Sequence, residues 1–273
     1  LGYAFFNLSD YNNAISHFKA FENSVATARP EMIADTRNRL GDSYYITTQY
    51  PQAIEYYDKV IDFGKTDADY AMFQKGFSLG LTGNQRQQAD VLSTLVIRYP
   101  SSPYVPNAIY ESGRAYMILE DNQRSEADFK TIINTYSATP FAPRAMVQLG
   151  LLYFNLGENQ KAVEQYKMVI EKFKSTPEAR YALTGLKTAY VEMNDVESYF
   201  AYMKGLQGYG DINLSEKDSL LYSSGESLYM SSDYARASNV FSNYLADYPA
   251  GIFRQNAQFY LADCLLRTDK KQE

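Results

Sequence analysis

The hydrophobic pattern of the chain repeats with a fixed phase. In most repeats a small residue is followed by a large apolar side chain three positions later, and by an alanine and an aromatic or leucine side chain twelve and sixteen positions later. A period in the thirties is typical of solenoids built from stacked helix pairs. No run of alternating apolar and polar residues predicts a strand, so we expect an all-α fold. The small residues lie 35 to 40 positions apart: Gly2, Gly41, Gly76, Gly113, Gly150, Gly185, Gly225 and Ala262.

Most repeats keep the two later positions. The aromatic position is occupied by Phe18, Tyr57, Leu92, Phe129, Tyr166 and Phe241, with Ala201 as the departure. The alanine position is occupied by Ala14, Ala53, Ala162 and Ala237, with Gln88, Ser125 and Glu197 as the departures. A glycine inside a helix costs about 0.5–1 kcal/mol relative to alanine. We therefore expect the glycines to mark places where two helices approach so closely that a side chain would separate their backbones.

Each repeat is expected to hold two helices joined by a short turn. The first helix extends over about fifteen residues across the glycine, and the second carries the alanine and aromatic positions. Residues that favour helix starts precede or open the second helices: Ser9-Asp10, Pro51, Asp121-Asn122, Asn194-Asp195 and Ser231-Ser232-Asp233. Clusters of proline, serine and glycine at 99–103, 137–140, 175–177 and 248–251 separate the repeats.

We predict a single solenoid over residues 1–273, with an irregular loop over 205–214. The first repeat begins one residue before its glycine and the last stops eleven residues after Ala262, so we expect a fragment of a longer chain. The sixth repeat departs from the pattern at Thr188 and Glu197, and its second helix could shift register to use Phe200 or Tyr202. It is either a hinge or contact loop, or a repeat whose sequence has drifted. The predicted repeat units are approximately 1–30, 31–67, 68–103, 104–140, 141–177, 178–215, 216–251 and 252–273.

This order of small and aromatic positions, closed by a proline at Pro100 and Pro249, resembles the tetratricopeptide repeat. The resemblance extends over essentially all 273 residues. It implies a right-handed superhelical solenoid of antiparallel helix pairs, with about seven to eight repeats. It also implies that one stripe of each first helix lines a concave groove in which peptides bind.

That stripe consists of the positions three before, one after and four after each small residue, which share one face of a helix. Tyrosine is typical of adaptable recognition surfaces, because it combines contact area with a polar tip. We predict that the stripe binds a segment of another protein, steered weakly by Asp42, Arg114 and Glu226. The alternative is that these rings pack against neighbouring helices; the stripe also includes Leu186. The predicted groove residues are Tyr3, Phe6, Tyr45, Phe73, Phe77, Tyr110, Arg114, Met117, Phe154, Tyr222, Glu226 and Tyr229.

Composition and charge narrow the class of partner. Apolar residues make up 45% of the chain and charged residues 21%, which is enough apolar material for a core. The net charge of −6 argues against nucleic acid, which requires a basic stripe. No apolar run reaches the length of about eighteen residues that a membrane span needs. The stripe also lacks the lysine, arginine and asparagine set with which some tetratricopeptide domains clamp chaperone C-termini. We therefore expect a different protein or peptide partner.

Catalytic chemistry has few candidates in this sequence. His17 is the only histidine and Cys264 the only cysteine, and no metal-binding or nucleophile-elbow motif is present. The glycines of 205–210 follow a predicted helix rather than a strand and lack the lysine of a phosphate loop. We expect a non-enzymatic protein without a metal or cofactor, and an unrecognised enzyme ranks third among the functional classes.

Two segments indicate which group of tetratricopeptide repeat proteins the chain resembles. Residues 98–110 (RYPSSPYVPNAIY) and 247–262 (DYPAGIFRQNAQFYLA) are similar to repeats of bacterial envelope proteins, among them lipoproteins of outer-membrane assembly and the periplasmic partner of the Tol system. This similarity implies a periplasmic or outer-membrane-associated location. A glycan-binding lipoprotein of nutrient uptake is the second functional class, although the chain lacks the tryptophan that sugar platforms favour. End-to-end self-association of the fragment is a further expectation.

Overall fold

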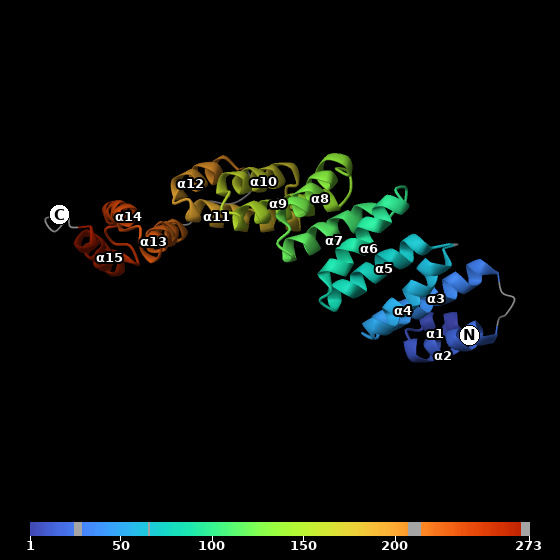
Figure 1. Ribbon diagram of the computed structural model, residues 1–273. Coiled ribbons are helices and arrows are strands. Elements are labelled where there is room, and N and C mark those ends of the chain that lie inside the picture. The colour runs from blue at the N-terminus through green and yellow to red at the C-terminus, as the bar shows by residue number, and fades with distance from the viewer. Residues whose placement is uncertain (25–28, 65, 207–213, 269–273) are drawn as a thin grey trace. The chain divides into compact units, whose positions relative to one another are not determined.

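A computed structural model describes residues 1–24, 29–64, 66–206 and 214–268 of the protein. Every regular element in these residues is an α-helix, which confirms the all-α prediction (Figure 1). The irregular loop predicted over 205–214 falls mostly on residues 207–213, which lie outside the described ranges. The superhelical handedness implied by the resemblance stays a prediction.

The helices follow one another in pairs that match the predicted repeats. The first helices are α1 (Gly2–Asn7), α3 (Pro30–Ile46), α5 (Ala68–Leu81), α7 (Val105–Ile118), α9 (Phe141–Asn155), α11 (Pro177–Glu192), α13 (Leu214–Met230) and α15 (Arg254–Arg267). The second helices are α2 (Tyr11–Ser24), α4 (Tyr50–Phe63), α6 (Gln85–Arg98), α8 (Asn122–Thr135), α10 (Asn159–Lys172), α12 (Val196–Gly205) and α14 (Tyr234–Asp247).

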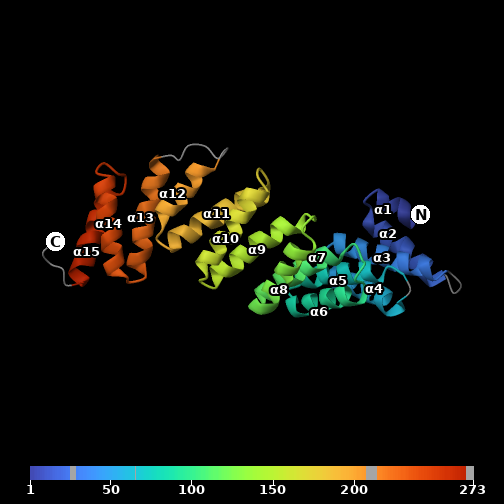
Figure 2. The ribbon, with the colours of Figure 1, turned by 90° about the horizontal axis from the view of Figure 1, so that it is seen from above.

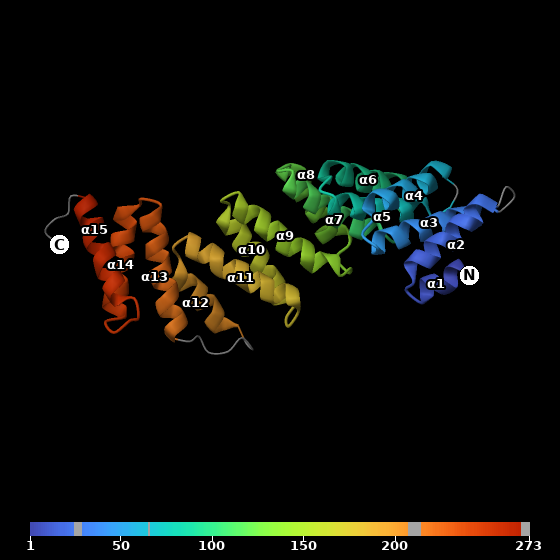
Figure 3. The same cartoon turned by 90° about the horizontal axis from the view of Figure 1, so that it is seen from below.

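The chain divides into two compact units, Leu1–Gln148 and Leu149–Glu273. Within each unit, consecutive helices joined by short connections pack side by side, as Figure 2 shows. In the first unit the first helices α3, α5 and α7 also contact one another directly, so that they form one layer (Figure 3). A layer of this kind places equivalent positions of successive repeats next to each other.

The predicted helix-start residues act as caps in the structure. Asp10, Asp121, Asp195 and Asp233 each accept a hydrogen bond of 3.2 Å from the backbone N–H three residues later. Such a bond satisfies one of the free donors at a helix N-terminus. Pro51 lies in the first turn of α4, where its missing N–H costs nothing. A residue with positive φ stands seven positions after the small residue in six of the turns: Ser9, Thr48, Gly83, Glu120, Gly157 and Ser232.

The repeated glycines make room for a buried side chain of the same repeat. A methyl group added to Gly113 would lie 2.9 Å from Cε1 of Phe129, sixteen residues later. Carbon atoms in contact are ordinarily about 3.5–4.0 Å apart, so the ring would have to move. The expected close packing is confirmed, with the correction that a side chain rather than the facing backbone fills the space. The same approach recurs in the pairs Gly2–Phe18, Gly41–Tyr57, Gly76–Leu92, Gly150–Tyr166 and Gly225–Phe241.

The phase that the sequence assigns to the sixth repeat is wrong by two positions. Its left-handed turn residue is Asn194, nine rather than seven positions after Gly185. Counted back from this turn, the buried Tyr190 takes the apolar position that was assigned to Thr188. Gly185 instead packs against Tyr166 of the preceding second helix, where an added methyl group would lie 2.5 Å from the ring.

The altered phase changes how the sixth repeat packs. Helix α11 contacts α10 more extensively than it contacts α12. Tyr166 therefore fills the space next to Gly185, and Ala201 is exposed. Phe200 is buried on α12. Leu186 was placed in the groove stripe by the incorrect phase, and the structure buries it completely.

Candidate functional site

Three of the predicted groove residues are buried within their own units. Phe73 stacks on Tyr104 with ring centroids 4.9 Å apart, and Tyr222 stacks on Phe253 at 4.4 Å. Tyr110 is equally buried, and this burial raises its pKa. A buried ring offers little area to a partner. At these three positions the rings therefore pack against neighbouring helices, which is the alternative given above.

The other predicted residues keep part of their surface. Two are exposed, Tyr3 and Arg114, and the rest are half-buried: Phe6, Tyr45, Phe77, Met117, Phe154, Glu226 and Tyr229. In the second unit the tyrosine hydroxyls already form hydrogen bonds within the fold. Tyr229 donates one to Asp263 at 2.6 Å, and Tyr222 donates one to Glu226 at 3.1 Å. The first unit is where the predicted residues border open space.

A hollow of about 380 Å³ opens on the layer formed by α3, α5 and α7. Three predicted residues line it: Tyr45 from α3, Phe77 from α5 and Arg114 from α7. Helix α6 contributes two further residues of the lining. We call this space the first-unit hollow; its remaining lining residues are Gly80, Leu81, Gln85, Gln88, Glu111, Ala115 and Ile118. Its volume lies within the range of about 300–1,000 Å³ that is common for ligand pockets.

The first-unit hollow exists because the third repeat lacks a side chain at one stripe position. Four residues after the small residue, the second and fourth repeats carry Tyr45 and Met117, whereas the third carries Gly80. The amide of Gln88 lies directly beneath this glycine. A methyl group on Gly80 would be 2.8 Å from both Nε2 and Oε1 of Gln88.

An exposed aliphatic row borders the first-unit hollow, and the sequence stripe missed it. Ile46, Leu81 and Ile118 stand five positions after the small residues of three successive repeats, and their side chains are 46%, 55% and 63% exposed. Leu81 and Ile118 line the hollow. The signal was present in the sequence as three aliphatic residues at one phase, one position beyond the predicted stripe.

The charges of the first-unit hollow compensate each other. Nη1 of Arg114 lies 3.0 Å from Oε2 of Glu111, one helical turn away. Burial raises the pKa of Glu111, and the charge of Arg114 opposes this change. Burial also raises the pKa of Tyr45. The hollow therefore combines an apolar rim, a neutral amide and a paired ion, which together form a lining that can bind a ligand.

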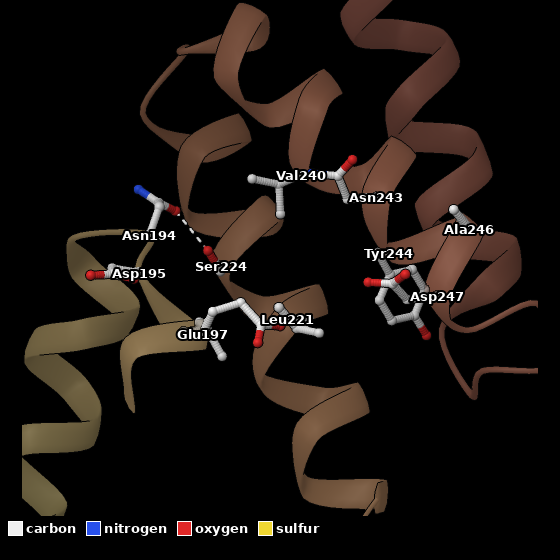
Figure 4. Close-up of a pocket in the computed structure, with 11 residues that line it drawn as sticks. Asn194, Asp195, Glu197, Leu221, Ser224, Val240, Asn243, Tyr244, Ala246 and Asp247 are labelled. Atoms are coloured by element: carbon white, nitrogen blue, oxygen red, sulfur yellow. Dashed lines mark hydrogen bonds between the residues drawn. The ribbon is translucent and has the colours of Figure 1, made fainter. Parts of the chain in front are cut away.

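A second hollow, of about 340 Å³, lies in the second unit among α12, α13 and α14 (Figure 4). Its lining includes the carboxyl groups of Asp195, Glu197 and Asp247. Ser224 points toward Asn194 and donates it a hydrogen bond of 2.8 Å. Two of these carboxyl groups already have partners within the fold. Asp195 caps α12, and Glu197 pairs with Lys217 at 3.3 Å.

The two rare side chains of the sequence differ in their surroundings. His17 is half-buried, stacks on Phe5 with ring centroids 5.1 Å apart and borders a hollow of about 480 Å³. Cys264 is fully buried, and burial raises the pKa of its thiol. Among the described residues no three histidine, cysteine or carboxylate side chains gather closely enough to hold a metal ion. The helices in the described ranges include none with the length and apolar character of a membrane span.

Asp128 on α8 is a partly buried carboxyl beside a smaller hollow of about 250 Å³. Its Oδ2 has no hydrogen-bond partner among the described residues. Burial raises the pKa of Asp128 to about 6 from the ordinary value of 3.8, although Ser112 and Arg124 oppose the change. Because the folded-state pKa is the higher one, ionisation of Asp128 destabilises the fold above about pH 6, and this penalty disappears as the pH falls below about 4.

We expect the substitution Asp128→Asn to raise the free energy of unfolding at about pH 7.5 by about 2 kcal/mol, after allowance for partial exposure. At about pH 3 the variant and the parent protein should be equally stable, because the parent carboxyl is then mostly protonated in both the folded and the unfolded state. Urea unfolding at both pH values measures the difference. Asp90→Asn, at an exposed position of α6, is the control and should change neither value. A stability difference that does not vary with pH would contradict this prediction.

Comparison with known proteins finds matches to one repeat family and to several solved repeat structures. Residues 144–176 match the tetratricopeptide repeat model, and residues 17–102 match a family described as an uncharacterised Treponema protein. No curated protein sequence matches the chain. A tetratricopeptide repeat protein from Parabacteroides merdae is similar in structure, with 16% identity, a TM-score of 0.59, and coverage of 97% of this chain and 96% of its own. MamA is similar over 60% of this chain and 91% of its own, with 22% identity and a TM-score of 0.52. At these identities the likeness is one of fold.

Proposed function

We propose that this chain, a tetratricopeptide repeat protein, is a non-enzymatic scaffold whose first compact unit binds an apolar segment of another protein. One observation carries the proposal. The first-unit hollow is bordered by the exposed side chains of Leu81 and Ile118 and by the ring of Tyr45. Aliphatic groups in contact with water around a concave site are typical of surfaces that another protein covers.

The lining suits a protein segment better than a charged ligand. The exposed aliphatic row supplies apolar area, while Glu111 and Arg114 neutralise each other. A partner segment that places an apolar side chain between Leu81 and Ile118 removes both from water, at about 25 cal/mol for each Å² of apolar surface buried. Binding is therefore expected to depend on contact area and weakly on salt.

Truncation of the rim tests this function. Short peptides enriched on the full chain from a randomised display library serve as the probe, and fluorescence anisotropy gives their dissociation constants. We expect the combined substitution Tyr45→Ala, Leu81→Ala and Ile118→Ala to weaken binding by about tenfold or more. The three side chains are at least partly exposed, so the fold should survive their loss.

Ile97→Ala is the matched control, because Ile97 is an exposed aliphatic residue of the same unit that does not line the first-unit hollow. Its affinity should equal that of the parent chain. Equal affinity in the triple variant, or failure to enrich any peptide, would show that the first-unit hollow is not the binding site.

The location in the cell is a separate proposal. We infer a periplasmic or outer-membrane-associated protein from the similarity of the Tyr-Pro segments at 98–110 and 247–262 to repeats of bacterial envelope proteins. Fractionation of the source cells, followed by detection of the chain with an antibody, would test it. Recovery in the cytoplasmic fraction would contradict it.

A further inference from the structure

Gln88 on α6 is a largely buried residue whose amide has no protein partner. The residue is 7% exposed, and its side chain makes no hydrogen bond to any residue in the described ranges. Alanine is the usual residue at this position in the pattern. Its amide lines the first-unit hollow and is not among the enclosed side-chain atoms that lack a partner, so water reaches it. A molecule that fills the hollow displaces this water and has to supply the partner, because an unpaired buried polar group costs about 1–3 kcal/mol.

The surroundings direct this amide into the first-unit hollow. Gln88 forms part of the lining, and its amide lies against the Cα of Gly80, where an added methyl group would be 2.8 Å from both the nitrogen and the oxygen. Any larger residue at position 80 would cover or displace the amide. Gly80 therefore opens the hollow and keeps both polar atoms of Gln88 accessible from it.

The chemistry of the amide defines what it recognises. A primary amide offers a donor and an acceptor side by side, and this pair matches the C=O and N–H of one residue in an extended segment, which point to the same side of the chain. The interior peptide units of a helix have already used both groups, whereas an extended segment leaves them free. A terminal carboxylate would find only acceptors in Glu111 and no unpaired cation, because Arg114 is already paired.

We propose that Gln88 binds the main chain of an extended partner segment: its Nε2 donates to the C=O of one residue, and its Oε1 accepts from the N–H of the same residue. The flanking side chain of the segment then lies between Leu81 and Ile118. This inference rests on the proposed function, since it assigns a conformation and a recognition contact to the segment that the first-unit hollow binds.

The experiment combines variants of the full chain with a backbone scan of an enriched display peptide. Each peptide unit is replaced in turn by an ester, which removes one N–H donor without changing the side chains. We expect one ester to weaken binding to the parent chain by about five- to tenfold. Gln88→Met should weaken binding of the unmodified peptide to a similar degree, and that ester should then have no further effect.

Gln85→Met is the matched control, because Gln85 lines the same hollow from the same helix but is less buried. It should leave both the affinity and the ester profile unchanged. Thermal unfolding shows whether Gln88→Met folds; the ester scan on the parent chain remains a test if it does not. The proposal is overturned if every ester binds the parent chain equally well, or if Gln88→Met retains full affinity.

The combined outcomes test the Gln88 contact separately from the proposed scaffold function. Loss of binding in the rim variant with retained binding in Gln88→Met keeps the scaffold function and rejects the main-chain contact. Equal binding in the rim variant and the parent rejects both. Binding of neutral oligosaccharides that depends on Gln88, without peptide binding, would reject both in favour of a glycan site.

Discussion

Replacement of Gly41 by alanine is expected to lower the free energy of unfolding by about 2 kcal/mol or more. Alanine favours a helix by about 1 kcal/mol relative to glycine, so propensity alone predicts the opposite sign. The added methyl group would overlap the ring of Tyr57, which is fully buried. Overpacking of this kind costs about 1–3 kcal/mol and occasionally more.

The ring of Tyr57 has little freedom to move away from residue 41. Its hydroxyl donates a hydrogen bond of 2.9 Å to Oδ1 of Asp42, and Tyr70 donates to the same oxygen at 2.8 Å. A shift of the ring would therefore strain the contact between the second and third repeats as well. The midpoint of urea unfolding of the full chain, followed by circular dichroism, measures the effect.

Gly205→Ala is the control for this prediction. Gly205 ends α12, and a methyl group added there would meet nothing within 4 Å. The substitution should leave the unfolding midpoint unchanged or raise it slightly, because only the backbone effect remains. A Gly41→Ala variant as stable as the parent would mean that the glycine phase does not reflect side-chain packing.

Replacement of Tyr166 by alanine is expected to destabilise the second unit by about 3–4 kcal/mol. The ring lies against two glycines of successive first helices, Gly150 on α9 and Gly185 on α11. Its loss would create a cavity between two repeats. A solenoid is held together by contacts between neighbouring repeats, so this cavity should weaken the repeats on both sides.

Tyr166→Phe separates the ring from its hydroxyl. Burial raises the pKa of Tyr166 to about 12, so its hydroxyl is neutral over the physiological range. Its side chain makes no hydrogen bond to the residues that the structure describes. We expect Tyr166→Phe to be as stable as the parent, and hydrogen exchange to show that Tyr166→Ala loosens both α9 and α11. Loosening confined to one of them would contradict the bridging role.

The candidate site was predictable in outline but not in detail. Tyr45, Phe77 and Arg114 were chosen from helical periodicity, and all three border the first-unit hollow. The same rule selected Phe73 and Tyr110, which the structure buries. Periodicity reports which residues share a face, but it does not report how far a neighbouring helix covers that face.

The sixth repeat shows that the position of glycine alone does not establish the phase of a repeat. Gly185 fits the period of the other glycines, yet two extra residues lie between it and its turn. A small residue can make room for a ring on either side of its helix, and the sequence does not say which side is used. The contact with Tyr166 settles that question.

The sequence by itself determined the all-α class, the pairing of helices and the caps at Asp121, Asp195 and Asp233, because these follow from local backbone chemistry and from period. Only the tertiary structure decided which stripe residues stay exposed and that Gly80 uncovers the amide of Gln88. Both depend on how the layers of neighbouring repeats fit together. Burial and cavities arise from contacts between segments that are distant in sequence, whereas periodicity describes each helix alone.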